Sequence, residues 1–103
     1  MEITKGRDGW QATSTVPLEG KRHLKIRTGK SDRAGLVTMA SAFVLTDTGY
    51  TFVMFEDFSK RVGQADARCT EKTVALAHAA VMAKVEEIKA DALAYYKEMK
   101  VKP

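Results

Sequence analysis

One short stretch of the chain, Lys21–Arg33, concentrates positive charge. Six of its thirteen residues are Lys or Arg, and Asp32 is the only acidic residue among them. Cations two residues apart on a strand lie on the same face of a sheet, where they can contact successive phosphates. We therefore expect this stretch to bind an anionic partner, either single-stranded nucleic acid, which is the more specific expectation, or an acidic protein surface. The candidate contacts are Lys21, His23, Lys25, Arg27, Lys30 and Arg33.

A second interpretation of the same stretch needs no partner. Exposed strand faces are commonly charged for solubility, and lysines on an edge strand discourage aggregation. The triplet Gly29–Ser31 also resembles the end of a phosphate-binding P-loop. Such a loop needs a glycine at the position of Leu24 and a helix directly afterwards, and this sequence supplies neither. The triplet is therefore predicted to belong to the turn of a β-hairpin.

The other reactive residue types do not assemble into a catalytic or metal-binding site. The acidic residues form no convincing pair, and His23 and His78 lack the spacing of known zinc ligands. His78 lies on the apolar face of an expected helix, where we expect a hydrogen-bonded side chain. Cys69 comes just before that helix and is expected to form a hydrophobic staple with Val74 rather than a nucleophile. We expect a non-catalytic protein without a cofactor or a metal ion.

The bulk properties describe one small domain, residues 1–103. Hydrophobic residues make up 45% of the chain and charged residues 29%, which is ordinary for a globular protein. The net charge of +4 favours acidic partners. The sequence shows no secretory signal, one cysteine and no apolar run of the roughly 18 residues that a membrane span needs. We expect a cytoplasmic protein that does not enter a membrane.

Glycine and aspartate punctuate the first two thirds of the chain and predict tight turns between short strands. Connections this short favour an antiparallel meander, in which each strand pairs with the next. The expected strands are Glu2–Lys5, Trp10–Val16, Arg22–Thr28, Leu36–Leu45 and Tyr50–Ser59.

The last third predicts one long helix from Glu71 to about Glu98, because this segment contains neither Gly nor Pro and follows a good N-cap, Thr70. Apolar residues recur at spacings of three and four: Val74, His78, Val81, Val85, Ile88, Ala92, Tyr95 and Met99. We predict an α+β fold, with an antiparallel meander of about five strands and one long C-terminal helix packed across one sheet face. In element order alone, this arrangement resembles the single-stranded nucleic-acid binders of the Whirly and Pur families.

The period of two along a strand predicts which residues face away from the helix. In the third strand, Leu24 and Ile26 share the core side, which places Lys21, His23, Lys25 and Arg27 outside. In the fourth strand, the core side is expected to carry Val37, Met39, Phe43 and Leu45. The fourth and fifth strands are both apolar on both sides in the middle, so periodicity alone does not identify the core side of either. We expect Phe55 beside the basic residues, as a platform on which bases stack.

Apolar side chains on the outward side of the fourth and fifth strands also permit a different function. Exposed apolar surface is typical of protein interfaces, of which a homodimer is the simplest, and we therefore expect the chain to form a homodimer. The alternative to nucleic-acid binding is therefore a small homo-oligomeric interaction module in which the basic strand is only solvated. Small side chains on several faces of the expected helix would allow it to contact a second subunit as well as its own sheet.

Overall fold

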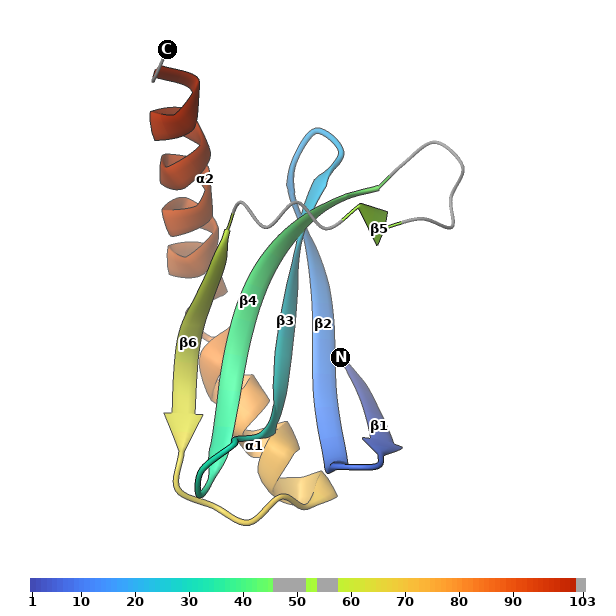
Figure 1. Ribbon diagram of the computed structural model, residues 1–103. Coiled ribbons are helices and arrows are strands. Elements are labelled where there is room, and N and C mark those ends of the chain that lie inside the picture. Colours follow the sequence, from blue (N-terminus) through green and yellow to red (C-terminus); the bar gives the residue numbers. More distant parts are fainter. Residues whose placement is uncertain (46–51, 54–57, 102–103) are drawn as a thin grey trace.

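The computed structural model describes residues 1–45, 52–53 and 58–101. Figure 1 shows an antiparallel sheet with two consecutive helices on one side of it, which confirms the α+β class. The elements are β1 (Glu2–Gly6), β2 (Gly9–Glu19), β3 (Arg22–Lys30), β4 (Leu36–Leu45), β5 (Phe52–Val53), β6 (Ser59–Ala65), α1 (Glu71–Met82) and α2 (Val85–Val101).

The first four strands pair in the order of the sequence, as a meander requires. Both β5 and β6 then pair with the edge of β4 that β3 leaves free, β5 opposite Val44 and Leu45 and β6 opposite residues 36–41. The turn into β4 depends on Gly35, which has a φ of +91°. A Cβ at this position would lie 2.5 Å from the carbonyl oxygen of Ala65. Only glycine therefore allows the β3–β4 turn to pass this close to the end of β6.

Four of the predicted strands are confirmed, and the fifth is confirmed only in part. Within the range predicted for the fifth strand, residues 50–59, β5 covers Phe52–Val53, and most of the remainder lies outside the described residues. The pattern of Ser59–Ala65 does not predict a strand, because a bulge interrupts its alternation. Gly63 pairs with Thr38 and Arg61 pairs with Met39, so Val62 is an extra residue in β6.

The core lies between the sheet and the helices, and the sequence-based assignment of β4 to its faces is wrong. The buried inward residues of this strand are Leu36, Thr38, Ala40 and Ala42. The residues predicted to face the core pair instead with outward residues of β3: Val37 with Gly29, Met39 with Arg27, and Phe43 with His23. The larger side chains are outside because α1 packs closely against the sheet and leaves room mainly for small residues beneath it.

The helical region begins where the sequence predicts. The Thr70 hydroxyl accepts a hydrogen bond from the backbone N–H of Thr73 at 3.1 Å, and the Thr73 hydroxyl accepts one from the N–H of Thr70 at 2.9 Å. These two bonds form a capping box. Cys69 and Val74 pack in the same apolar cluster, which agrees with the hydrophobic staple. The Cys69 thiol also donates to the Trp10 carbonyl at 3.3 Å.

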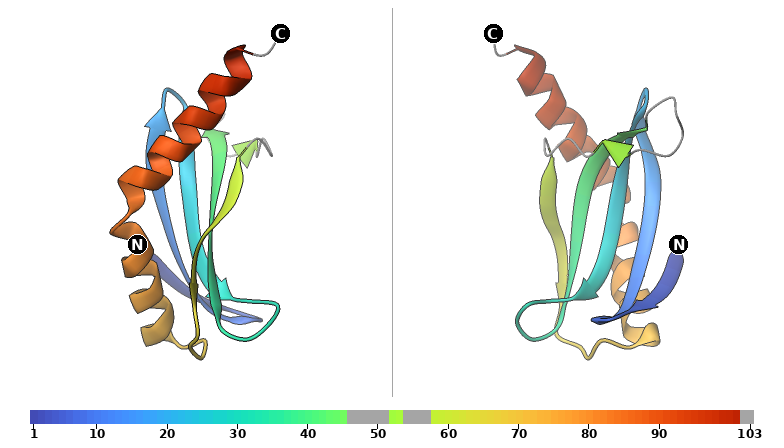
Figure 2. Two further views of the ribbon diagram at one scale, coloured as in Figure 1. Left: turned by 90° about the vertical axis from the view of Figure 1, so that its left-hand side faces the viewer. Right: turned by 45° about the vertical axis from the view of Figure 1, so that its right-hand side comes forward.

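The prediction of one long helix is wrong, because the chain breaks between Met82 and Val85. At the break, Lys84 N–H donates to the carbonyl of Val81, three residues back, rather than four. Figure 2 shows that α2 leaves the direction of α1 and that its last turns pass the ends of the strands. Because a sheet twists, a straight helix of this length would diverge from it, and a break allows two shorter helices to follow it.

The apolar stripe, meaning the predicted apolar residues at spacings of three and four, continues from α1 into α2, but the prediction that Tyr95 belongs to it is wrong. Val81, Ile88 and Ala92 are buried, and Val85 packs against the same cluster. Tyr96 is 5% exposed and Tyr95 is 37% exposed, so Tyr96 rather than Tyr95 continues the stripe. The Arg22 guanidinium lies 3.8 Å from the centre of the Tyr96 ring. This cation–π contact joins the second half of α2 to the start of β3.

The closest approach of α1 to the sheet predicts a sensitive position. A Cβ on Gly63 would lie 2.5 Å from Cγ2 of Val81, a stiff β-branched side chain that cannot move aside easily. We expect Gly63→Ala to lower the free energy of unfolding by about 1–3 kcal/mol, measured by urea denaturation.

Two further variants test the cause of this loss. Adding Val81→Ala to Gly63→Ala should cost less than the sum of the two single changes, because the clash is removed. Gly6→Ala is the control, since a Cβ there meets nothing within 4 Å, and it should change the stability by less than about 0.5 kcal/mol. A Gly63→Ala chain as stable as the parent would contradict the packing described here.

Candidate nucleic-acid interface

The face of the sheet turned away from the helices carries unpaired positive charge. Lys25 and Arg27 are exposed on β3, and Arg61 is exposed on β6. The register places Arg27 opposite Met39 and Met39 opposite Arg61, so two arginines lie in one row across three strands with Met39 between them. None of these three cations forms an ion pair with another described residue.

Carboxylates are few on the described part of the same surface, where Asp8 and Asp32 lie in turns beside the hollows. The outward positions of β2, β3, β4 and β6 carry polar, apolar or basic side chains among the described residues, and Glu2 on the edge strand β1 is the only acidic residue paired into an outward row. Glu19 is on the helix side, where it borders a hollow with Leu93 and Tyr96 of α2. Among the described strand residues, the outward side therefore carries Lys25, Arg27 and Arg61 against one carboxylate, that of Glu2, and it is the side that the helices leave open.

Arg61 is the site residue that the sequence did not indicate. In a regular strand Val62 would pair with Met39 and face outward, and Arg61 would point toward the core. The bulge at Val62 reverses this arrangement, so Val62 packs against the core and Arg61 lies beside Met39. The same shift places Lys60 on the helix side, where its ammonium is 3.0 Å from the carboxylate of Asp91. An assignment that alternates strictly between the two faces of a strand does not predict these positions of Arg61, Val62 and Lys60.

The predicted ladder divides into two parts in the structure. Lys25 and Arg27 lie outward as predicted, whereas Lys21 is exposed in the turn between β2 and β3. Lys30 and Arg33 lie at the opposite end of the sheet, in and next to the β3–β4 turn, where they line a common hollow with Arg61. Phe55, the predicted stacking platform, lies outside the described residues.

His23 is held in place by two contacts. Its ring stacks on that of Phe43 with centroids 5.6 Å apart and an angle of 23° between the planes. Its Nδ1 lies 3.0 Å from the Lys21 carbonyl oxygen, so this nitrogen carries a proton and donates. Phe43 is only 5% exposed, which makes His23 the accessible member of the pair. Histidine rings can stack on bases, and this ring is on the basic face.

Two hollows adjoin Met39 on the outer face. The larger, of about 680 Å³, is lined by Arg61, Gln64, Val37 and Met39 together with residues 30–33 of the β3–β4 turn. The smaller, of about 170 Å³, is lined by Arg27, Gln11, Val37 and Met39, with Lys30 and Asp8 among its other residues. Each hollow combines apolar side chains with one strand arginine, an arrangement that differs from a uniformly solvated charged strand.

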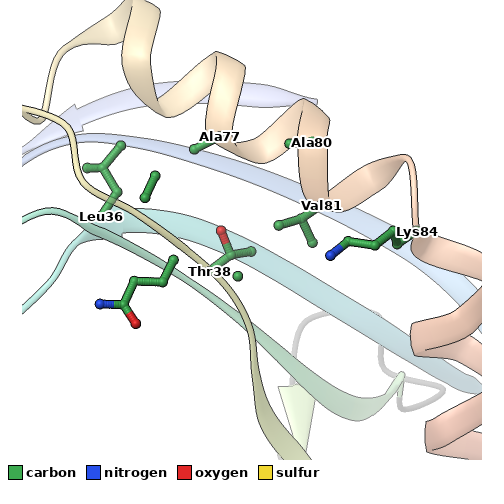
Figure 3. Close-up of a pocket in the computed structure, with 9 residues that line it drawn as sticks. Leu36, Thr38, Ala77, Ala80, Val81 and Lys84 are labelled. Atoms are coloured by element: carbon green, nitrogen blue, oxygen red, sulfur yellow. The ribbon is translucent and has the colours of Figure 1, made fainter.

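A different hollow lies on the helix side, between α1 and the strands β4 and β6. Figure 3 shows Leu36, Val81, Ala77 and Ala80 around it, with the Lys84 side chain at one end. The volume is about 180 Å³. The Thr38 hydroxyl in its wall is already bonded to the hydroxyl of Thr28 at 2.7 Å. Apart from Lys84 and Gln64, the side chains that line this hollow are apolar or already hydrogen-bonded, so we interpret it as a packing gap beside the helix.

His78 is a structural residue, in agreement with its predicted hydrogen-bonded role. The side chain is fully buried, its Nε2 lies 2.7 Å from the Ser14 hydroxyl, and its Nδ1 lies 2.9 Å from the Thr28 hydroxyl. Burial lowers the pKa of His78 below its usual value, and the positive charge of the chain's amino terminus lowers it further. The imidazole is therefore neutral at physiological pH and links α1 to the sheet.

Comparisons with protein-family models, with curated proteins and with solved structures gave no significant match. No helix in the described part of the chain is both long and apolar enough to cross a membrane. Across residues 1–45, 52–53 and 58–101, no three side chains of the His, Cys, Asp or Glu type are grouped to hold a metal ion. The function must therefore be inferred from the geometry of the chain itself.

The lowered pKa of His78 predicts a loss of stability in mild acid. As the pH falls below about 6.5, the unfolded chain takes up a proton on this residue before the folded chain does. The free energy of unfolding should then fall as the pH is lowered further, measured by urea denaturation on either side of this value.

The pH dependence can be assigned to His78 by substitution. His78→Gln should remove most of this loss, whatever its own stability at neutral pH, because the titrating group is absent. His23→Gln is the matched control and should retain the loss, since His23 is on the other face of the sheet. An unchanged pH dependence in His78→Gln would show that another group is responsible.

Proposed function

We propose that the protein is a non-catalytic binding domain that holds single-stranded nucleic acid on the outer face of its sheet. The observation that supports this most strongly is the row of Arg27, Met39 and Arg61, with Lys25 two residues from Arg27 on the same strand. These cations form no ion pair with another described residue, and the apolar side chain of Met39 lies between the two arginines. Lys30 and Arg33 extend the positive surface at the β3–β4 turn.

A phosphate backbone fits this surface better than the alternatives considered. Residues two apart on a strand are about 6.6 Å apart, and neighbouring strands are about 4.8 Å apart, so the cations form a grid that an extended anionic chain can follow. An acidic protein would also meet the charges. It would make less use of the hollows beside Met39, because carboxylates on a folded surface lack a flat apolar group to place there. Single strands offer such groups in their unpaired bases.

The salt dependence of binding tests this proposal. With about four phosphates contacted, log K for a single-stranded oligonucleotide should fall with log salt at a slope near −3, measured by fluorescence anisotropy between about 50 and 200 mM salt. Replacing Lys25 and Arg27 by Gln should lower both the affinity and the steepness of the slope, and circular dichroism should remain unchanged, because both side chains are exposed.

A matched pair of cations on the helices provides the control. Lys72 and Lys97 are exposed on α1 and α2, and replacing both by Gln changes the net charge equally. This variant should lose much less affinity than the variant of Lys25 and Arg27. Equal losses of affinity in the two double variants, or no binding of the parent protein at low salt, would show that the basic stretch is only a solvated hairpin.

A homo-oligomeric interaction module is the second candidate function, and one observation favours it. Leu76 on α1 is 63% exposed, and Ala79 and Ala80, which follow on the same side of the helix, are exposed as well. The outer sheet face is the less suitable interface for a second copy, since pairing it with itself would oppose Lys25, Arg27 and Arg61 of two subunits. An interface through the helices would leave the basic face open, so dimerisation and nucleic-acid binding are compatible.

Sedimentation tests the oligomer. If the helix layer forms an interface, the protein at micromolar concentration should sediment at about twice the 11.4 kDa chain mass, and Leu76→Glu should restore the monomer. The same substitution should leave oligonucleotide binding per chain largely intact, because Leu76 is on the other side of the sheet from Arg27. A parent protein that stays monomeric at high concentration would exclude the homo-oligomeric interaction module as the function.

A further inference from the structure

The two hollows on the outer face share one wall. Val37, Met39 and Lys30 line both of them, whereas Arg61 lines only the larger and Arg27 only the smaller. Because neighbouring strands are about 4.8 Å apart, the backbones of the two arginines are roughly 10 Å apart with Met39 midway between them. The Met39 side chain therefore separates two compartments, each with a guanidinium on its far side.

These compartments are not needed to hold phosphates. A phosphate gains from a cation and from N–H donors, and it gains nothing from the apolar side chains of Val37 and Met39. A nucleobase gains from both kinds of group: its ring contacts the thioether of methionine favourably, and it stacks on or bonds to the planar guanidinium of arginine. The bases of a duplex are stacked and paired inside the helix and cannot enter such hollows.

We propose that each hollow takes one unpaired base of a single strand, with Met39 between two successive bases and Lys30 beside the phosphate that joins them. This inference rests on the proposed function and adds to it the contact with bases. Arginine has donors and no acceptor. Guanine carries a carbonyl at position 6, and thymine and uracil carry one at position 4, where adenine and cytosine respectively carry an amino group. Guanine, thymine and uracil therefore suit Arg27 and Arg61 better than adenine and cytosine.

The other polar residues of the hollows do not reverse this preference. Gln11 and Gln64, one beside each hollow, have amide groups that can donate as well as accept and so favour neither class of base. The carboxylates of Asp8 and Asp32 line one hollow each and could accept from an amino group, but both residues belong to turns and neither is paired with Met39. The strand positions beside Met39 are occupied by the two arginines.

Three oligonucleotides of about twelve nucleotides separate base contacts from phosphate contacts: oligodeoxyuridine, oligodeoxycytidine and an abasic strand of the same length. Uracil and cytosine are similar in size and differ mainly in the carbonyl or amino group at position 4. By fluorescence anisotropy at mildly alkaline pH, we expect the uridine strand to bind about fivefold more tightly than the cytidine strand, and the abasic strand to bind at least tenfold more weakly than the uridine strand.

Arg61→Lys tests the assignment, because it retains the positive charge and removes the planar fork of donors. The preference for uridine should shrink to about twofold or less, while the slope of log K against log salt should stay the same. Arg68→Lys is the matched control, since Arg68 lies between β6 and α1 and lines neither hollow, and it should keep the full preference.

The outcomes distinguish this inference from the proposed function. Equal binding of the abasic and uridine strands would overturn the base sites and leave phosphate binding standing. An undiminished, roughly fivefold preference in Arg61→Lys, or a preference for cytidine in the parent protein, would overturn the roles given to the arginines. If none of the three strands binds at low salt, the proposed function itself fails.

Discussion

The arrangement of this protein depends on one buried imidazole. His78 bonds to Ser14 on β2 and to Thr28 on β3, and Thr28 bonds in turn to Thr38 on β4. One helical side chain is thereby connected to three strands. Burying any of these polar groups without its hydrogen-bond partner would destabilise the folded state. Thr28 and Thr38 must therefore both face α1. Among the described residues, every buried polar side-chain atom has a partner. With those two threonines inside, the alternation along each strand places Arg27 and Met39 outside.

Much of the fold is predictable from the sequence, because its signals are local. Turn glycines, short alternating strands and the N-cap at Thr70 depend on neighbouring residues, and the structure confirms the first four strands and the start of the helical region. The outward positions of Lys25 and Arg27 are also predictable, because Leu24 and Ile26 alternate with them clearly. This half of the candidate site required no knowledge of distant contacts.

The features that were not predictable depend on packing between elements. In β4, hydrophobicity favours Val37, Met39 and Phe43 as core, but the space beneath α1 admits Thr38, Ala40 and Ala42 instead. The break after Met82 follows from the twist of the sheet, and neither Gly nor Pro marks it in the sequence. Burial of Tyr96 in place of Tyr95 depends on the new direction of α2 and on Arg22. Each error has the same origin, since a pattern along one element does not show how closely its neighbour approaches.

The bulge in β6 has a consequence for how this surface can change during evolution. Substitutions alter one side chain at a time, and they leave the other residues of the strand on their existing sides. Loss of the single codon for Val62 would leave them there too, because it would remove the extra residue and restore a regular strand in which Arg61 still pairs with Met39 and Lys60 with Ala40. Arg61 and Lys60 would keep their sides, and the deletion would remove only the Val62 side chain from the core. Related chains with a strand one residue shorter and no bulge can therefore carry the same arginine row.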